Sequence, residues 1–219
     1  MRIEIEITPN IELVPISYQR KLVGTIHKWL GYNFIHDKTS LYSFSWLENG
    51  HRVLDFLDFP GGSKMFFSAY DSSIIEKLIS GIKKDPCLFC GMTVADVIIQ
   101  ENSFAVNRDM FYCATPILVK STLQNRSYKH YTFNDKDANQ IMKRILQRKM
   151  NIAGLKDDSM DVKFDSSYMN KRTKIVLFGK ISNRVNICPV IIQGSLETKL
   201  FALNVGIGSS TGCGFGFIY

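Results

Sequence analysis

The sequence predicts an α+β fold built from two ferredoxin-like (RRM-like) units in tandem. Each half of the chain shows strand and helix patterns in an order close to β-α-β-β-α-β. Of its 219 residues, 45% are hydrophobic and 21% are charged, so the chain can bury a sizeable core and is not of the disordered class. We expect the boundary near residues 102–110, with domains at 1–104 and 105–219.

The elements of the first unit follow from periodicity and from turn residues. Residues 1–8 alternate Ile with charged residues, which predicts a half-buried strand. Residues 17–30 repeat apolar side chains at helical spacing until Gly31. A second helix begins at Asp71 or Ser72 and ends before Pro86. Further strands are predicted at residues 41–47, 64–69 and 93–99.

The second unit repeats this order less regularly. Residues 135–150 are expected to form a helix whose basic side chains point outward, namely Lys143, Arg144, Arg148 and Lys149. Ser195 caps a last helix that ends at Gly206. Strands are predicted at residues 111–119, 162–168, 174–181, 186–192 and 214–219, with a hairpin turn at 169–173.

The positive charge lies in the second half of the chain. Residues 1–110 hold 11 basic and 13 acidic residues, whereas residues 111–219 hold 16 and 7. A local excess of this size is typical of a surface that binds a polyanion such as a nucleic acid. A solvated basic surface without a partner is the alternative.

The composition argues against several other classes of protein. The chain has no apolar run long enough to span a membrane, and residues 1–8 lack the pattern of a signal peptide, so we expect no membrane association and a cytoplasmic location. Five cysteines do not predict a disulfide framework. Cys87 and Cys90 form a CxxC without a second ligand pair, which favours buried structural thiols over zinc. We therefore expect no metal and no cofactor.

The end of the chain carries the most specific motif. Five glycines fall within residues 206–216, which indicates a backbone that turns sharply or lies close to another segment. Unpaired N–H groups in such a loop can bind a phosphate. A dinucleotide-binding GxGxxG loop would instead follow a strand and open a helix. A flexible terminal turn is the remaining alternative.

This glycine pattern, G-h-G followed after five residues by G-h-G, resembles that of the CRISPR-associated repeat-processing endoribonucleases of the repeat-associated mysterious protein superfamily. The Ile-rich first strand, Val14-Pro15 and a helix with Leu22 and Gly24 are similar to the start of the same family, so the resemblance spans the chain. It implies metal-independent cleavage within the repeat of a CRISPR precursor RNA to give guide RNAs. We expect RNA binding at the loop glycines Gly206, Gly208, Gly214 and Gly216.

Cleavage of RNA without a metal needs a base for the 2′-hydroxyl, an acid for the 5′-oxygen and a cation for the phosphorane. His27 on the first helix and His36 after it are the candidates, as base and acid or in the reverse roles. The resemblance implies a nearby lysine, which Lys38 matches approximately and Ser40 could replace. Reserve candidates are Tyr32 and Tyr42.

Further RNA contacts are expected on the basic second unit. Lys174, Val176, Phe178 and Lys180 would share one face of a strand, and cations beside an aromatic ring suit an RNA backbone. The predicted turn adds Lys171 and Arg172. The expected partners are the precursor RNA repeat, subunits of an effector complex and a second copy of the chain.

Two other functions remain open. A non-catalytic member of the superfamily would hold a guide RNA within an effector complex. A tandem ferredoxin-like regulator would bind a nucleotide through the glycine loop. Cleavage of repeat RNA in EDTA would distinguish an enzyme from a non-catalytic RNA-binding subunit. Nucleotide affinity without RNA affinity would indicate the nucleotide-binding regulator.

Overall fold

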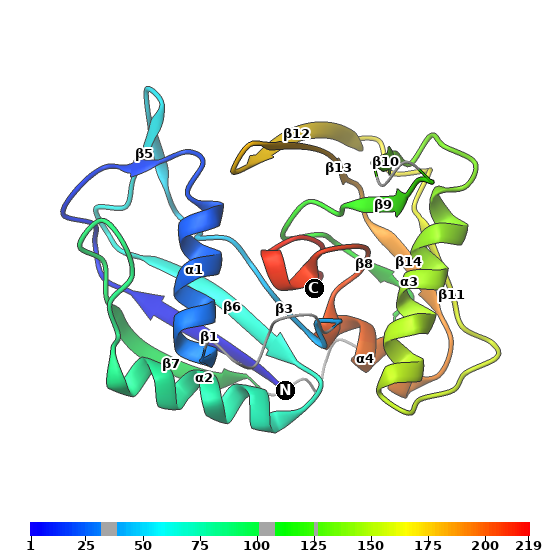
Figure 1. The fold of residues 1–219 in the computed structure, drawn as a ribbon, viewed down its shortest axis with the longest axis horizontal. Helices are drawn as coiled ribbons and strands as arrows, with labels where there is room; N and C mark the ends of the chain where they lie inside the picture. The colour runs from blue at the N-terminus through cyan, green and yellow to red at the C-terminus, as the bar shows by residue number, and fades with distance from the viewer. Residues whose placement is uncertain (32–38, 101–107, 125–126) are drawn as a thin grey trace.

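The computed structural model describes residues 1–31, 39–100, 108–124 and 127–219. Its first unit is a four-stranded antiparallel sheet in the order β3-β6-β1-β7, with two helices on one face (Figure 1). This is the strand order of a ferredoxin-like unit. The elements are β1 (Arg2–Ile7), α1 (Gln19–Leu30), β3 (Tyr42–Phe44), β6 (Ser63–Ala69), α2 (Ser72–Lys84) and β7 (Val94–Gln100).

The helices of the first unit begin and end close to where the sequence predicts. Asp71 caps α2, and its carboxylate accepts a hydrogen bond from the Ser73 N–H at 2.9 Å. Gly31 ends α1 with a φ of 85°, which a glycine adopts without strain. The sequence did not predict a further small sheet, because its strands are too short for periodicity to reveal. These strands are β2 (Val14–Pro15), β4 (His51–Val53) and β5 (Phe56–Asp58).

The second unit has the same strand order in a shorter form. β11 (Asp161–Phe164), β14 (Val190–Gln193) and β8 (Met110–Phe111) pair in that order, and a bridge from Cys113 to Ile218 lies where the fourth strand would be. The predicted strands at 111–119 and 214–219 are therefore wrong in extent. The helices are α3 (Ala138–Ile152) and α4 (Leu196–Val205), and Ser195 caps α4 as predicted.

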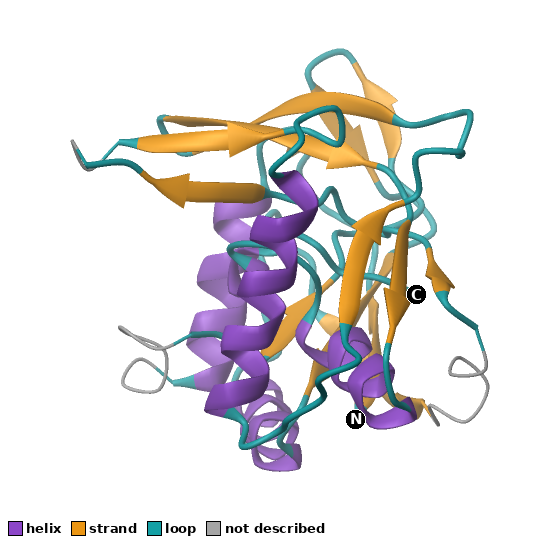
Figure 2. Cartoon of the chain, turned by 90° about the vertical axis from the view of Figure 1, so that its right-hand side faces the viewer, coloured by secondary structure: helices purple, strands orange, loops and turns teal. Residues whose placement is uncertain are grey.

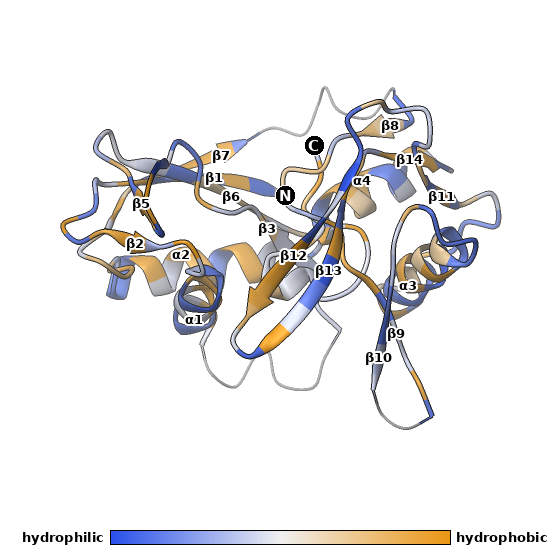
Figure 3. Ribbon diagram, turned by 90° about the horizontal axis from the view of Figure 1, so that it is seen from above, coloured by the Kyte–Doolittle hydropathy of each residue, from blue (hydrophilic) through white to orange (hydrophobic). Residues whose placement is uncertain are grey.

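Two hairpins are inserted into the second unit. β9 (Val119–Thr122) pairs with β10 (Tyr128–Tyr131), and β12 (Arg172–Phe178) pairs with β13 (Ile181–Ile187). The prediction of a hairpin turn at 169–173 is wrong, because the turn lies at residues 179–180, where Gly179 has a φ of 63°. β12 and β13 lie between α1 and α3 (Figure 3), and β9 and β10 project beyond one end of α3 (Figure 2).

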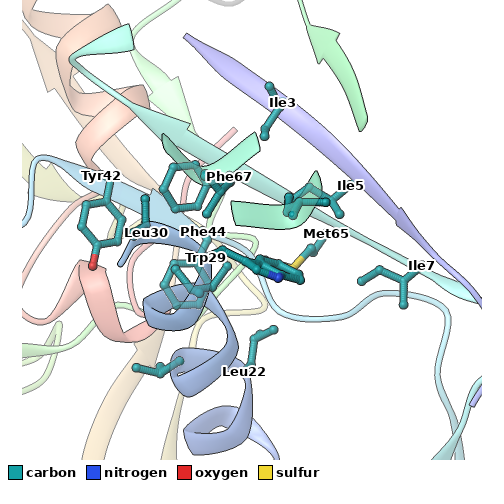
Figure 4. Close-up of a cluster of buried hydrophobic side chains, with 14 of the residues drawn as sticks. Ile3, Ile5, Ile7, Leu22, Trp29, Leu30, Tyr42, Phe44, Met65 and Phe67 are labelled. Carbon is teal, nitrogen blue, oxygen red and sulfur yellow. The ribbon is translucent and has the colours of Figure 1, made fainter. Parts of the chain in front are cut away.

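Each unit has its own cluster of buried side chains. The first lies between α1, α2 and the sheet and includes Ile3, Trp29 and Phe67 (Figure 4). The second is built from side chains between residues 111 and 218. The Arg2 guanidinium connects the units, because it donates to the carbonyls of Leu203 at 3.0 Å and Ile218 at 2.9 Å. The end of the chain is thereby fixed against the first sheet.

Candidate nucleic-acid interface

The glycine-rich loop follows α4 and lies buried where the two units meet. Gly206, Gly208, Gly214 and Gly216 have φ values between 67° and 82°, a region that favours glycine. A Cβ atom at Gly206 would lie 2.7 Å from the Gly216 carbonyl oxygen, and one at Gly208 would lie 2.5 Å from that of Leu118. The motif therefore allows backbone segments to approach closely, one of the two roles that the sequence indicated.

Several N–H groups of the loop are used within the protein. Six of them donate to carbonyl oxygens, namely those of Gly206, Ile207, Ser209, Cys213, Gly214 and Gly216. The shortest of these hydrogen bonds runs from Ser209 to Leu118 at 2.6 Å. A phosphate could not use these six amides without breaking the loop. Ser209 and Ser210 of the loop carry half-buried hydroxyls beside a pocket, and Ser209 Oγ accepts a hydrogen bond from the Lys120 N–H at 3.3 Å.

Lys149 lies beneath the loop and ties it to α3. The prediction that this side chain points outward is wrong, because Lys149 is only 4% exposed. Its Nζ donates to the Val205 carbonyl and to Thr211 Oγ1, each at 2.8 Å, and to the Gly206 carbonyl at 3.4 Å. Burial lowers the pKa of Lys149 to about 7. Three acceptors match the three donors of the protonated ammonium group.

A pocket of about 350 Å³, which we call the loop pocket, opens beside the loop. Residues 39–40 of the first unit and residues 208–211 of the second line it together. Two cations line it, the half-buried Lys120 of β9 and the exposed Arg148 of α3. The Lys120 Nζ lies 4.4 Å from the centroid of the Tyr128 ring. Hydroxyls and cations around an open hollow provide the groups that bind a phosphate.

His27 lies half-buried on a face of α1 that is kept open. Gly24 and Gly31 share this face, three residues before His27 and four residues after it. Nothing lies within 4 Å of a Cβ position at either glycine. α1 also contacts the short 3₁₀ turn η2 (Thr211–Cys213) of the glycine loop. The helix that carries His27 is thus in contact with the loop.

His36 and Lys38 lie outside the described residues. The described chain resumes at Thr39, and a Cβ atom at Gly212 would overlap the hydroxyl of Ser40, so the segment that follows these two residues lies against the glycine loop. Burial raises the pKa of Tyr42, a reserve candidate, to about 12, because desolvation disfavours the phenolate. Tyr42 is therefore poorly suited to proton transfer at neutral pH.

The four cations predicted to bind RNA are spread along hairpin β12–β13. Lys171 and Arg172 lie at one end of β12, and Lys180 lies at the hairpin turn, about 20 Å away at the usual rise of a strand. The Lys171 Nζ donates to two backbone carbonyls, at 2.8 and 3.3 Å, and so stabilises a turn. Arg172, Lys174 and Lys180 are exposed.

The face of β12 that was predicted to meet RNA packs partly on the protein. Val176 is 5% exposed and packs with Phe215, and the Phe178 ring lies 6.4 Å from the Phe215 ring between centroids. Ile175 and Leu177, on the opposite face, are 60% and 55% exposed. The protein core therefore covers part of the face of β12 that the sequence pattern assigned to RNA binding.

Two of the pocket's side chains were outside the predicted site. Arg148 points outward from its helix, as the sequence predicts, but the sequence pattern does not connect it with Lys120. Lys120 lies on β9, and its neighbour Tyr128 lies on β10, a strand that the sequence did not predict. No sequence signal brings β9 and α3 together, because their contact depends on the hairpin.

Within the described ranges, no group of three or more His, Cys, Asp or Glu side chains could hold a metal ion. All five cysteines are free, and Cys87 is exposed, so the expectation of a buried thiol is wrong for Cys87. In the same ranges, no helix has the length and apolar character needed to cross a membrane.

The whole chain is similar in fold to several solved structures. The structure that characterises a Cas6-related gene from Pyrococcus furiosus has 19% identity and a TM-score of 0.85, covering 100% of this chain and 97% of that chain. A RAMP protein binding different RNA substrates has 18% identity and a TM-score of 0.82, covering 100% and 98%. A Cas6 product complex has 14% identity and a TM-score of 0.70, covering 99% and 98%. A comparison with curated proteins gives no match.

These likenesses establish the class of fold, a tandem of ferredoxin-like units, as the sequence predicted. The family model described as "CRISPR associated protein Cas6, C-terminal" matches residues 99–219, which is more than half of the chain. The protein belongs to the Cas6 family, whose members are CRISPR repeat-RNA-processing endoribonucleases. The resemblance inferred from the glycine motif is confirmed.

Proposed function

We propose that the protein is a metal-independent endoribonuclease that cleaves CRISPR precursor RNA within the repeat. The observation that carries the proposal is the loop pocket, because cations of the second unit there face the residues that directly follow His36 and Lys38. One of the related structures is a RAMP protein binding different RNA substrates, which supports an RNA substrate for this chain as well.

The proposed reaction is a proton-balanced transesterification. One histidine, His27, takes the proton of the 2′-hydroxyl, and the resulting oxygen attacks the adjacent phosphorus. The bond from phosphorus to the 5′-oxygen breaks, and His36 gives that oxygen a proton, or the two histidines act in the reverse roles. Lys38 stabilises the phosphorane charge. The products are a 2′,3′-cyclic phosphate and a 5′-hydroxyl.

RNA binding is divided between the units in this proposal. We assign catalysis to residues 1–104 and most of the RNA contacts to residues 105–219, and the separate buried clusters of the two units support this division. Hydroxyls of the glycine loop and the exposed cations Arg172, Lys174 and Lys180 would contact the RNA backbone. A cytoplasmic location, a homodimer and effector subunits as partners remain predictions.

Single-turnover cleavage of a repeat RNA in EDTA tests the proposal. His27→Ala and His36→Ala should each slow cleavage by about 10²- to 10⁴-fold, the usual contribution of a general acid or base. His51→Ala is the matched control, because His51 is exposed on β4. Loss of cleavage in EDTA would contradict the metal-free mechanism. RNA binding without cleavage under any condition would indicate the non-catalytic guide-holding function instead.

A further inference from the structure

A groove of about 530 Å³ runs between α3 and hairpin β9–β10. It shares Lys120, Ile145 and Arg148 with the loop pocket, so the two hollows adjoin. We call it the hairpin–helix groove. On α3 it extends from Asp137 to Arg148, about 17 Å at the rise of an α-helix. The groove therefore leads away from the loop pocket over a length that suits several nucleotides.

The charge of the groove is positive. Lys120, Arg144 and Arg148 line it, and Asp137, at its far end, is its acidic side chain. Arg144 and Arg148 are exposed and lie one helical turn apart. None of these three cations takes part in the ion pairs found among the described residues. Cations that converge on a groove without carboxylate partners are typical of a surface for a polyanion.

Apolar and aromatic groups lie between the cations. Ile145 on the α3 wall is half-buried, whereas Ile141 and Tyr131, which also line the groove, are each only 7% exposed. The Tyr128 ring, beside the junction with the loop pocket, is 55% exposed. Unpaired bases can pack on such groups, whereas the bases of a duplex are stacked and paired inside it. The lining therefore favours a single strand.

We propose that the hairpin–helix groove binds single-stranded RNA that flanks the phosphate held in the loop pocket. Arg144 and Arg148 contact the sugar–phosphate backbone, and bases pack against Ile145 and, where the groove meets the loop pocket, against the exposed Tyr128 ring. This inference deepens the proposed function, and it rests on that function in taking RNA as the ligand. It does not depend on cleavage, because the groove contains none of the proposed catalytic residues.

Fluorescence anisotropy with a labelled 20-nucleotide oligouridylate measures the contribution of the groove. The variant is Arg144→Gln with Arg148→Gln, and the matched control is Lys156→Gln with Lys163→Gln, which removes the same charge from exposed residues outside the groove. The groove variant should bind roughly tenfold more weakly, and its salt slope should fall by about 0.7 for each lost contact. The control should keep the wild-type slope. Circular dichroism melting checks that both variants fold.

Several outcomes would overturn the inference. Equal slopes for the two double variants would mean that only net charge matters. A loss of affinity confined to a 20-base-pair RNA duplex would contradict binding of a single strand, and absence of RNA binding by the wild type would overturn both proposals. Cleavage by the wild type with an unchanged slope in the groove variant would overturn the groove alone. Groove-dependent binding without cleavage would support the groove and contradict the proposed enzyme.

Discussion

Substitution of Gly216 by alanine tests whether the terminal glycines hold the fold together. Gly216 has a φ of 67°, and an alanine in this region costs about 1–2 kcal/mol. A Cβ atom would also lie 1.9 Å from the Ile207 carbonyl oxygen, so the backbone must shift, at a cost of about 1–3 kcal/mol. That shift would break the 2.8 Å hydrogen bond from Ile207 to Gly216, worth about 0.5–1.5 kcal/mol. The expected loss is about 3–6 kcal/mol.

Gly154→Ala provides the control for this experiment. Gly154 has a φ of 77°, but nothing lies within 4 Å of its Cβ position, so only the conformational cost of about 1–2 kcal/mol applies. Urea unfolding followed by circular dichroism should place Gly216→Ala about 2–4 kcal/mol below Gly154→Ala. Equal stability of the two variants would refute the argument. If Gly216→Ala were as stable as Gly154→Ala but lost RNA affinity, Gly216 would instead contact the RNA directly.

Three further substitutions test other parts of the structure. Burial lowers the pKa of Lys149 from 10.5 to about 7, so between these pH values the unfolded chain holds a proton that the folded chain lacks, and the unfolding free energy should rise with pH. Lys149→Met should remove this rise in urea titrations at different pH values. A rise that persists in Lys149→Met would contradict its assignment to Lys149. Gly24→Ala should stabilise α1 by about 0.5–1 kcal/mol and yet slow RNA cleavage if the His27 face receives substrate; an unchanged rate would exclude that face. Lys180→Gln should lower the salt slope of RNA binding by about 0.7. Lys171→Gln should lower the melting temperature instead, because Lys171 already donates to two carbonyls. Equal salt slopes for the two variants would contradict this contrast.

The main sheet and both helices of the first unit could be predicted from the sequence, because local signals and tertiary contacts agree there. The alternation in residues 1–8 gives β1, and Asp71 with Pro86 limits α2. In the second unit the strands are short and their partners lie far away in the chain. The predicted strand at residues 111–119 is divided between β8 and β9, because each end pairs with a different element.

The candidate site was predicted only in part because burial reverses two expectations based on residue type. Lys149 is a basic residue on an amphipathic helix, yet it points inward, since the Val205 and Gly206 carbonyls and the Thr211 hydroxyl need a donor there. Val176 and Phe178 face the core because Phe215 of the glycine loop lies beneath the hairpin. Both reversals depend on the folded loop, which a single sequence does not specify in space.

The buried glycines and the exposed cations have distinct physical roles that meet at the loop pocket. Positive φ values and close backbone approach fix the loop between β3 and the segment around Leu118, and Thr211 Oγ1 donates to the Tyr42 carbonyl at 3.1 Å. This fixed loop sets the distance between Ser40 and the cations Lys120 and Arg148. A phosphate that bound those cations would lie beside the chain that leads back to His36. The loop would therefore act on the reaction by placing the two units, and a substitution that loosened it should slow cleavage more than it weakens RNA binding.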